Sequence, residues 1–475
     1  GGMSIDGDRA IISSGRTVVG SVTGVVYVYE KSGNLWTRTA VLTAAAPTTT
    51  SLFGFTRGIA VSGGFIAVGI SDVDGSGNVS ASVCVFQEIG GIWTPVADLR
   101  PPPSTLARFG LDVSLDGCRL AVADIGDDDQ GTSAGAVYLY EFDGTTWALQ
   151  DKLFASSGNG AFGLALDLDG DRLLVGAADE AYVFAFDGSR WQTEATLVGQ
   201  DTMVTDNYGR AVSLSGQYAV VGASNHPHVS AQVGGAAYVF RRDPSGWVQD
   251  VELLPDLLCL ACGFGKSVAI DGSSILVSAA GDDEFAANAG AAHLYDLAAG
   301  IWSEEEKFSS SGVGSEIFFA SQIALDGGNA FGSSPFAEDG GAVYAFDVCV
   351  KSKAEFRNSG TNPASYSIAP PLLGTTVQAS IDLQGTTGHS LALLLGFDSQ
   401  DSLTLRGGQT LLVSDGGSGE LLGLPTATGP VATFLLNIPS DISLAGFALS
   451  TQAMHFGGVQ PFALSNAIDL ILGQY

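Results

Sequence analysis

Basic residues and long apolar runs are both scarce in this sequence. Lysine and arginine together number 20, against 50 acidic residues, and the formal net charge is −30. A surface this acidic repels nucleic acid and anionic lipid, so we expect no nucleic-acid partner. No apolar run approaches the roughly 18 residues that a membrane-spanning helix needs, so we also expect no membrane span.

Cysteine is scarce too, and this excludes a disulfide scaffold. There are five cysteines, and an odd number leaves at least one unpaired within the chain. Cys259 and Cys262 have the CxxC spacing of a redox pair or of half a zinc site. No second CxxC or nearby histidine accompanies them, and no βαβ pattern surrounds them. We interpret the pair as a local disulfide or as two buried thiols.

Known catalytic and targeting motifs are missing. The chain has no nucleophile elbow, HExxH, P-loop or dinucleotide-binding fingerprint. Acidic pairs occur throughout so acidic a chain and single out no glycosidase pair. We therefore expect no enzymatic activity. There is also no signal peptide, but the chain opens with Gly1 and Gly2 in the middle of a repeat, so we expect that the natural N-terminus lies upstream.

What the sequence has in abundance is glycine, together with short apolar segments. It contains 64 glycines and 45% hydrophobic residues, whereas only 15% of its residues are charged. Glycine supplies the positive φ angles of tight turns, and alternating apolar segments can fill a core. This composition predicts an all-β protein and argues against glycine-rich disorder.

Two unrelated markers recur with one period. Aromatic-glycine pairs return at intervals of 46 to 56 residues, and the tryptophans return at intervals of 44 to 57 residues. The pairs are Phe53-Gly54, Phe109-Gly110, Phe162-Gly163, Tyr208-Gly209 and Phe264-Gly265, with Phe319-Ala320 as a degenerate copy. The tryptophans are Trp36, Trp93, Trp147, Trp191, Trp247 and Trp302. A period near 50 is typical of a propeller blade or a solenoid unit.

Each unit is predicted to contain four short strands. An alternating strand after the aromatic-glycine pair ends in an Asp-Gly hairpin, such as Asp116-Gly117, in which both central residues should have positive φ. A small apolar strand follows, then a variable loop and a strand of the Gly-Ala-Val-Tyr type. The tryptophan opens the fourth strand. Small residues on inner strands and aromatics further out fit a wedge-shaped blade, which favours a closed ring over a solenoid. Counting a shortened first unit, we predict a seven-bladed β-propeller over residues 1–348.

The aromatic-glycine pair, the Leu-Asp-Gly turn and the Gly-Ala-Val-Tyr strand together resemble the FG-GAP repeat. That repeat builds the propeller of integrin α subunits and of many secreted bacterial proteins. The resemblance implies adhesion or ligand binding in an extracellular or cell-surface location. Integrin-type repeats often hold calcium in a D-x-D-x-D-G-x-x-D loop between the second and third strands, and the loops of this chain depart from that pattern.

Calcium ligands are nevertheless predicted in those loops, with a plain solvated acidic loop as the alternative. Calcium takes six to eight oxygen ligands, which a loop rich in aspartate and glycine can supply. The candidates are Asp72 and Asp74 in blade 2, Asp127, Asp128 and Asp129 in blade 3, and Asp282 and Asp283 in blade 6. In blade 2 a glycine directly follows the second aspartate, which breaks the integrin register. Blades 1, 4 and 5 lack an acidic cluster.

Histidines in the blade 5 loop offer a second metal hypothesis. His226 and His228 could present two nitrogens to a metal ion. No cysteine is near, and carboxylates are distant in sequence. We therefore interpret this segment as an exposed polar loop.

After the propeller, residues 351–475 are predicted to form an antiparallel β-sandwich. Apolar segments alternate there with turn clusters, and tryptophan disappears. The opening segment 356–363 resembles a C-terminal domain found on large secreted bacterial proteins.

Blade 7 is expected to lack its tryptophan-bearing fourth strand and to have an open edge. Either an upstream strand completes it, or a strand is donated by a neighbouring subunit, which would link copies into a filament. The sequence thus favours a non-enzymatic interaction or scaffolding protein with a protein or glycan ligand. The alternatives are a calcium-dependent carbohydrate-binding lectin and an enzyme that uses the central channel.

Overall fold

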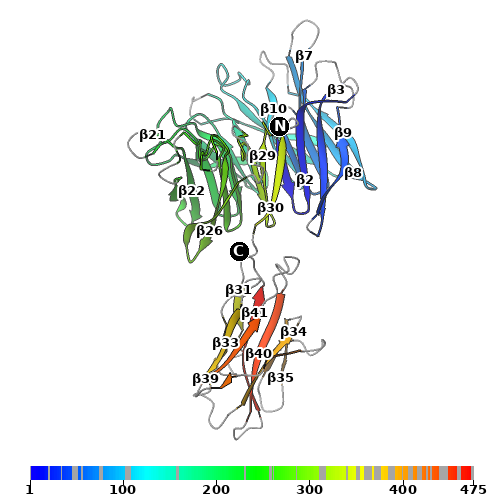
Figure 1. Ribbon diagram of the computed structural model, residues 1–475. Helices are drawn as coiled ribbons and strands as arrows, with labels where there is room; N and C mark the ends of the chain where they lie inside the picture. The colour runs from blue at the N-terminus through cyan, green and yellow to red at the C-terminus, as the bar shows by residue number, and fades with distance from the viewer. Residues whose placement is uncertain are drawn as a thin grey trace. The chain divides into compact units, whose positions relative to one another are not determined.

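The computed structural model shows an all-β chain that divides into two compact units, Gly1–Phe346 and Asp347–Tyr475 (Figure 1). The described residues of the first unit are 2–19, 22–33, 35–44, 52–54, 57–73, 79–101, 108–156, 160–228, 232–255, 259, 261–284, 286–309, 317–337 and 341–348; in the second unit only the strands are described. Nowhere in these residues is there a helix with the length and apolar character that a membrane crossing requires.

The first unit is a seven-bladed β-propeller of antiparallel blades, which confirms the predicted fold class. The first, innermost strands are β1 (Met3–Asp6), β6 (Ile59–Ser62), β10 (Phe109–Asp116), β14 (Ala165–Asp169), β18 (Tyr208–Ser215), β24 (Val268–Asp271) and β28 (Ile323–Asp326). The second strands are β2 (Arg9–Val19), β7 (Phe65–Val73), β11 (Arg119–Asp124), β15 (Arg172–Gly176), β19 (Tyr218–Ala223), β25 (Ser274–Ala279) and β29 (Asn329–Ser334).

The outer half of each blade carries the third and fourth strands. The third strands are β3 (Val22–Ser32), β8 (Val79–Ile89), β12 (Ala136–Phe142), β16 (Ala181–Phe186), β22 (Ala236–Asp243), β26 (Ala291–Ala298) and β30 (Ala342–Asp347). The fourth strands are β4 (Leu35–Leu42), β9 (Ile92–Leu99), β13 (Trp147–Leu153), β17 (Trp191–Leu197), β23 (Gly246–Leu253) and β27 (Ile301–Phe308). Short extra strands are β5 (Leu52–Phe53), β20 (Pro227–His228) and β21 (Gln232–Val233).

Both repeated markers lie in the core. The aromatic of every aromatic-glycine pair is at most 2% exposed. The glycine that follows has positive φ, and in the degenerate copy Ala320 keeps this conformation with a φ of 61°. The tryptophans pack between blades: the rings of Trp147 and Phe65 of the preceding blade are 5.3 Å apart, and Trp36 makes the same contact with Phe331 at 5.1 Å. The second contact joins blade 1 to blade 7.

The inner hairpins differ from the prediction. Asp116 is the last strand residue, paired with Arg119, so the two loop residues are Gly117 and Cys118. Only the glycine has positive φ, at 55°, so the prediction that Asp and Gly both adopt it is wrong. The aspartate has another role, because its Oδ2 accepts a hydrogen bond of 2.7 Å from the N–H of Gly170 in the next blade.

This bond between neighbouring turns recurs around the whole ring. An aspartate or serine at the end of each inner strand accepts the N–H of the turn glycine in the next blade. The pairs are Asp6 with Gly63, Ser62 with Gly117, Asp116 with Gly170, Asp169 with Gly216, Ser215 with Gly272, Asp271 with Gly327 and Asp326 with Gly7. The last pair closes the ring between blades 7 and 1.

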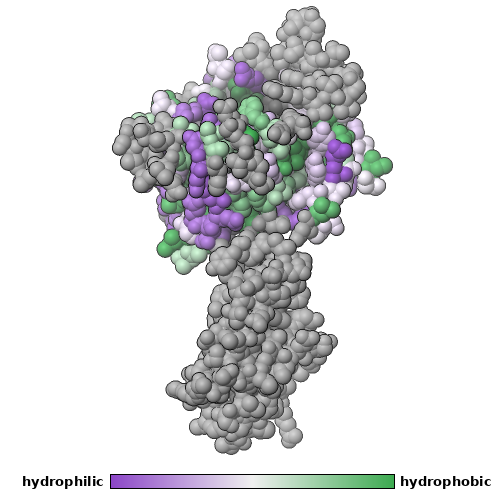
Figure 2. Space-filling view, viewed as in Figure 1, coloured by the Kyte–Doolittle hydropathy of each residue, from purple (hydrophilic) through white to green (hydrophobic). Residues whose placement is uncertain are grey.

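Blade 7 has three strands within the described residues, in the order β28-β29-β30. Its outermost described strand, β30, lies next to the blue strands of blade 1 in Figure 1, in keeping with the packing of Val343 in one apolar cluster with Tyr29 and Trp36. On the visible propeller surface, Figure 2 shows hydrophobic residues in small separate groups among hydrophilic ones.

The second unit contains a five-stranded sheet, β31-β41-β40-β34-β37, and a four-stranded sheet, β32-β33-β39-β38, with a separate hairpin of β35 and β36. Its strands are β31 (Lys353–Arg357), β32 (Tyr366–Ile368), β33 (Thr376–Asp382), β34 (Leu391–Phe397), β35 (Gln400–Thr404), β36 (Thr410–Val413), β37 (Glu420–Gly423), β38 (Thr426–Ala427), β39 (Val431–Asn437), β40 (Ala448–Phe456) and β41 (Phe462–Ile471). The packing of two sheets into a sandwich stays a prediction.

Candidate functional site

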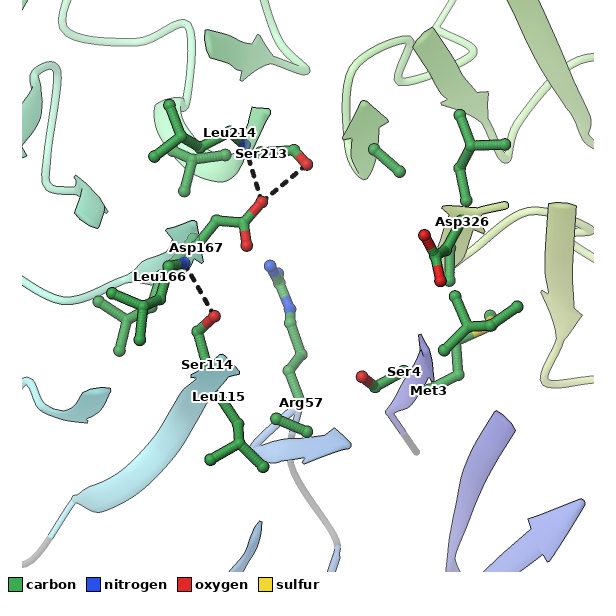
Figure 3. Close-up of a pocket in the computed structure, with 18 of the residues that line it drawn as sticks. Met3, Ser4, Arg57, Ser114, Leu115, Leu166, Asp167, Ser213, Leu214 and Asp326 are labelled. Atoms are coloured by element: carbon green, nitrogen blue, oxygen red, sulfur yellow. Dashed lines mark hydrogen bonds between the residues drawn. The ribbon is translucent and has the colours of Figure 1, made fainter. Parts of the chain in front are cut away.

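A polar cavity of about 410 Å³ lies at the centre of the ring, lined by residues of all seven inner strands. Arg57 extends into it beside Asp167 (Figure 3). Its Nη1 donates to the backbone oxygen of Arg210 at 2.9 Å. Arg57 therefore places a positive charge in a channel that is also lined by carboxylates, serines and apolar residues.

Two carboxylates of the channel wall, Asp112 and Asp167, are only partly exposed. Burial raises the pKa of Asp112 to about 7, although the charge of Arg57 and the N–H of Leu166 act in the opposite direction. Burial also raises the pKa of Asp167 to about 6. Asp167 Oδ2 accepts from the Leu214 N–H at 2.7 Å and from the Ser213 hydroxyl at 2.9 Å. These oxygens hold neighbouring inner strands together.

The acidic loop of blade 3 is closed by a lysine. Asp127 is 4% exposed and accepts hydrogen bonds from the Tyr138 hydroxyl at 2.8 Å and from Lys152 Nζ at 2.7 Å. The same ammonium donates to Asp129 at 2.6 Å. Asp128 points elsewhere, accepting the Ser133 N–H at 2.7 Å. One cation thus lies between two of the three predicted calcium ligands.

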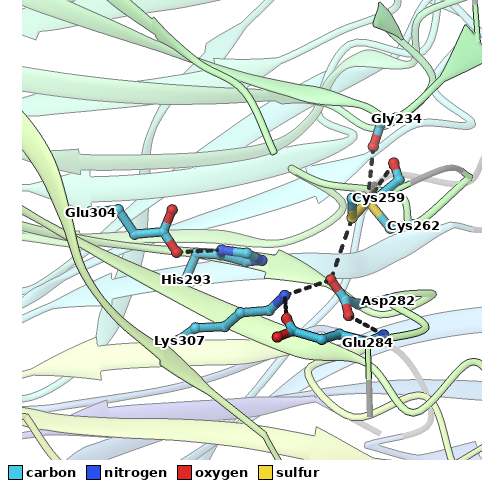
Figure 4. The surroundings of a disulfide bond; sticks show 8 residues. All are labelled: Gly234, Cys259, Cys262, Asp282, Glu284, His293, Glu304 and Lys307. Carbon is cyan, nitrogen blue, oxygen red and sulfur yellow. Dashed lines mark hydrogen bonds and ion pairs between the residues drawn. A yellow bond between two sulfur atoms is a disulfide. The ribbon is translucent and has the colours of Figure 1, made fainter. Parts of the chain in front are cut away.

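Blade 6 repeats this arrangement (Figure 4). Lys307 Nζ donates to Asp282 at 3.0 Å and also to Glu284, while Asp283 accepts the Asn288 N–H at 2.6 Å. Behind Asp282 lies a disulfide between Cys259 and Cys262 with an S–S distance of 2.03 Å. Of the two interpretations of the CxxC segment, the structure contains the disulfide.

In both loops an ammonium group of the protein pairs with carboxylates predicted to bind calcium, namely Asp127 and Asp129 in blade 3 and Asp282 in blade 6. Calcium there stays a prediction, and the ion would have to displace Lys152 or Lys307. In blade 2, Asp72 lies in β7, but its side chain and the whole of Asp74 lie outside the described residues. The calcium prediction for that loop is not tested.

In blade 5 the aspartate and the lysine of blades 3 and 6 are replaced by residues of different charge. His226 occupies the position of Asp127 and Asp282, since its backbone oxygen likewise accepts the N–H of the glycine before the third strand at 3.0 Å. Glu252 occupies the position of the two lysines, because it pairs with Tyr238 as Lys152 pairs with Tyr138. An acid therefore replaces the lysine, and a histidine replaces the aspartate.

The interpretation of His226 as part of an exposed polar loop is wrong. The residue is only 6% exposed, and three carboxylates surround it. Asp206 lies 2.9 Å from Nδ1, while Glu252 and Asp201 lie 3.5 and 3.8 Å from Nε2. The side chain of His228 lies outside the described residues. The blade 5 loop lacks acids of its own, but the preceding loop and the fourth strand supply them.

Sequence reasoning missed Lys152, Lys307, Glu252 and the two aspartates of blade 5. A signal for three of them was present: Lys152, Glu252 and Lys307 each stand five positions after a repeat tryptophan. The aspartates have no comparable marker, because the loops at the same place in the other blades carry different residues at the positions of Asp201 and Asp206.

Comparison with known proteins agrees with this geometry. The FG-GAP repeat family matches residues 93–140, 191–240 and 261–295. The first match runs from Trp93 of β9 to Tyr140 of β12, so a family repeat spans the end of one blade and three strands of the next. By fold the protein is a seven-bladed β-propeller. By sequence the three matched segments resemble FG-GAP repeats.

Solved structures show wider similarity at low identity. A candidate 6-phosphogluconolactonase from Bacteroides uniformis is 12% identical, with a TM-score of 0.46 over 72% of this chain and 96% of that one. The β-propeller domain of the Trilobed protease from Pyrococcus furiosus is 11% identical, with a TM-score of 0.38 over 68% and 89%. Neither activity is transferred to this chain at such values. A search of curated proteins gives no significant match.

Proposed function

We propose that the protein is a secreted or cell-surface, non-enzymatic interaction module that binds a polypeptide partner and acts in scaffolding or adhesion. The FG-GAP propeller fold generally mediates protein interactions, which supports the coarse part of this proposal. The disulfide Cys259–Cys262 is in keeping with an oxidising compartment.

The observation that carries the proposal is the exposure of strand β30. Ala342, Val343 and Tyr344 are half-buried, whereas the residues at the same places in blades 3, 5 and 6 are buried. In those blades a fourth strand covers the edge. Among the described residues, no strand pairs with the outer edge of β30. A β-strand with an unpaired edge and partly exposed apolar side chains is a template for strand addition.

Apolar side chains on the neighbouring blades extend this surface. Leu35, Ile92 and Ile301 stand directly before the repeat tryptophans of blades 1, 2 and 6 and are 67 to 69% exposed. The equivalent positions of blades 3, 4 and 5 hold Thr146, Arg190 and Gly246. Because blades 6 and 1 flank blade 7, the apolar positions gather on the side of the ring where β30 lies.

We take a second copy of this chain as the partner, donating an extended segment to β30. Association of the full chain should then rise with concentration in light scattering coupled to size-exclusion chromatography. Ala345→Lys should abolish it, because a lysine on an exposed strand edge blocks strand addition. Leu149→Lys, on the outer strand of complete blade 3, is the matched control and should leave association unchanged.

A strict monomer at high concentration would overturn the self-association, and equal effects of both variants would exclude β30 as its site. Glycan-array binding abolished by a calcium chelator would instead support a calcium-dependent lectin.

A further inference from the structure

The strongest unassigned cluster surrounds His226 in blade 5. Potential ligand atoms of Asp201, His226 and Glu252 all lie within 4.8 Å of one another. The side chain of His226 is 7% exposed and that of Glu252 is 23% exposed, whereas that of Asp201 is 56% exposed. The cluster therefore has a buried floor and one side open to solvent, through which an ion can enter.

The imidazole is held in one orientation by a buried acid. Asp206 is 1% exposed and lies 2.9 Å from Nδ1, and its Oδ2 also accepts the Met203 N–H at 2.8 Å. A carboxylate at Nδ1 fixes the proton on that nitrogen and leaves the Nε2 lone pair for another partner. This is how metal-binding histidines are commonly oriented in proteins.

The free side of the ring faces two carboxylates that are too far away for ordinary hydrogen bonds. Nε2 lies 3.5 Å from Glu252 Oε1 and 3.8 Å from Asp201 Oδ2. Asp201 is itself positioned by the Tyr238 hydroxyl, which donates to its Oδ1 at 2.8 Å. Ligands of a tetrahedral zinc ion with bonds of 2.0–2.2 Å are about 3.3–3.6 Å apart. The two distances to Nε2 are within a few tenths of an ångström of that spacing, and the two carboxylate oxygens lie within 4.8 Å of each other.

The charges of the cluster favour a bound cation. Three carboxylates surround one imidazole, and a lone pair facing carboxylate oxygens is repulsive unless positive charge lies between them. Blades 3 and 6 supply that charge at the equivalent place with Lys152 and Lys307. In blade 5 the equivalent residue is Glu252, so the protein does not supply it from that position.

We propose that blade 5 binds a divalent transition-metal ion of the zinc class through His226 Nε2, Asp201 and Glu252, with Asp206 orienting the histidine. Nitrogen together with two carboxylates suits zinc and its neighbours, whereas calcium prefers an all-oxygen site. The remaining coordination position faces solvent beside Asp201.

The test uses the full chain, freed of metal by a chelator, in a Cys118→Ser background that removes an exposed thiol. Isothermal titration should show one tight zinc site per chain that excess calcium does not compete for. Asp201→Asn and Glu252→Gln should each weaken zinc binding at least tenfold. Asp98→Asn should leave it unchanged, since Asp98 has the strand position of Glu252 in blade 2.

A spectroscopic measurement tests whether His226 itself binds the metal. Copper bound in place of zinc should show coupling to one nitrogen by electron paramagnetic resonance, and His226→Asn should remove it. Asp201 is half-exposed, so Asp201→Asn should keep the thermal stability of the metal-free protein and remain informative if His226→Asn does not fold. Absence of zinc binding, unchanged affinity in both carboxylate variants, or equal competition by calcium would each overturn the site.

Discussion

The carboxylate of Asp326 accepts a hydrogen bond from the N–H of Gly7, although the two residues are 319 positions apart in the chain. Six other blade boundaries carry an equivalent bond between residues 47 to 57 positions apart. The bond between Asp326 and Gly7 joins blades 7 and 1 at their inner strands, and the contact between Trp36 and Phe331 joins the same two blades further out.

Asp326→Ala should lower the free energy of unfolding by about 1 kcal/mol, since it removes one hydrogen bond and leaves the Gly7 N–H without its acceptor. Asp116→Ala removes the same bond between blades 3 and 4 and should cost a similar amount. The two should differ in hydrogen exchange. Only Asp326→Ala should accelerate exchange in β1 and β28, because no continuous chain links those blades directly. Equal exchange in both variants would contradict this role.

Gly135→Ala should destabilise the propeller by about 3 kcal/mol or more. A Cβ at Gly135 would lie 2.2 Å from the backbone oxygen of Phe162 in the next blade, and φ is +83°. Gly144→Ala is the control, because φ is +94° there but nothing lies within 4 Å. It should cost only about 1 kcal/mol of backbone strain. Chemical denaturation measures both, and equal losses would exclude the steric cause.

Lys152→Met should cost about 3–5 kcal/mol at neutral pH, because it leaves Asp127 buried beside no cation. Adding Asp127→Asn should recover part of the loss, since the amide oxygen still accepts from Tyr138. No recovery in the double variant would show that the lysine contributes by packing alone.

The same lysine should make the stability of the protein depend on pH in the alkaline range. Burial lowers the pKa of Lys152, but hydrogen bonds to Asp127 and Asp129 outweigh this effect, so its pKa is raised. Its contribution should be complete below the unfolded-state pKa of about 10.4 and be lost as pH rises towards the higher folded-state pKa. Urea unfolding at several alkaline pH values should show this decline in the wild type and not in Lys152→Met.

Asp112→Asn should stabilise the protein increasingly between about pH 4 and pH 7. The folded-state pKa of about 7 exceeds the unfolded value of about 3.9, so the unfolded chain loses this proton first as pH rises and the wild type loses stability across that window. The side-chain oxygen of asparagine can still accept the hydrogen bond from the Leu166 N–H, but the asparagine side chain does not ionise in this pH range. A difference in the free energy of unfolding between variant and wild type that does not change with pH would contradict the raised pKa of Asp112.

The propeller was predictable because its markers are local and repeated. Every aromatic-glycine pair is buried, and even Ala320 keeps the conformation that glycine adopts elsewhere. The Asp-Gly turn was misassigned because the preference for aspartate arises from a contact with the next blade, about one repeat away in sequence. A pattern confined to the hairpin cannot show that contact.

The candidate sites were harder to predict for the same reason. Lys152 lies 25 positions from Asp127, and Asp201 lies 25 positions from His226, so their contacts depend on blade geometry. An acidic run alone therefore indicated calcium where the fold places an ammonium group. Two separate histidines indicated a polar loop where the fold buries one of them among acids.

The bond between Asp326 and Gly7 has the same glycine N–H donor as its six counterparts and the same carboxylate acceptor as four of them, so this bond does not distinguish the junction of blades 7 and 1 from the others. A variant whose chain is opened at another blade boundary, or a relative that has gained or lost a whole blade by duplication or deletion, would keep an unbroken circuit of these bonds. Blade number and chain start are thus free to vary in evolution without new chemistry at the join.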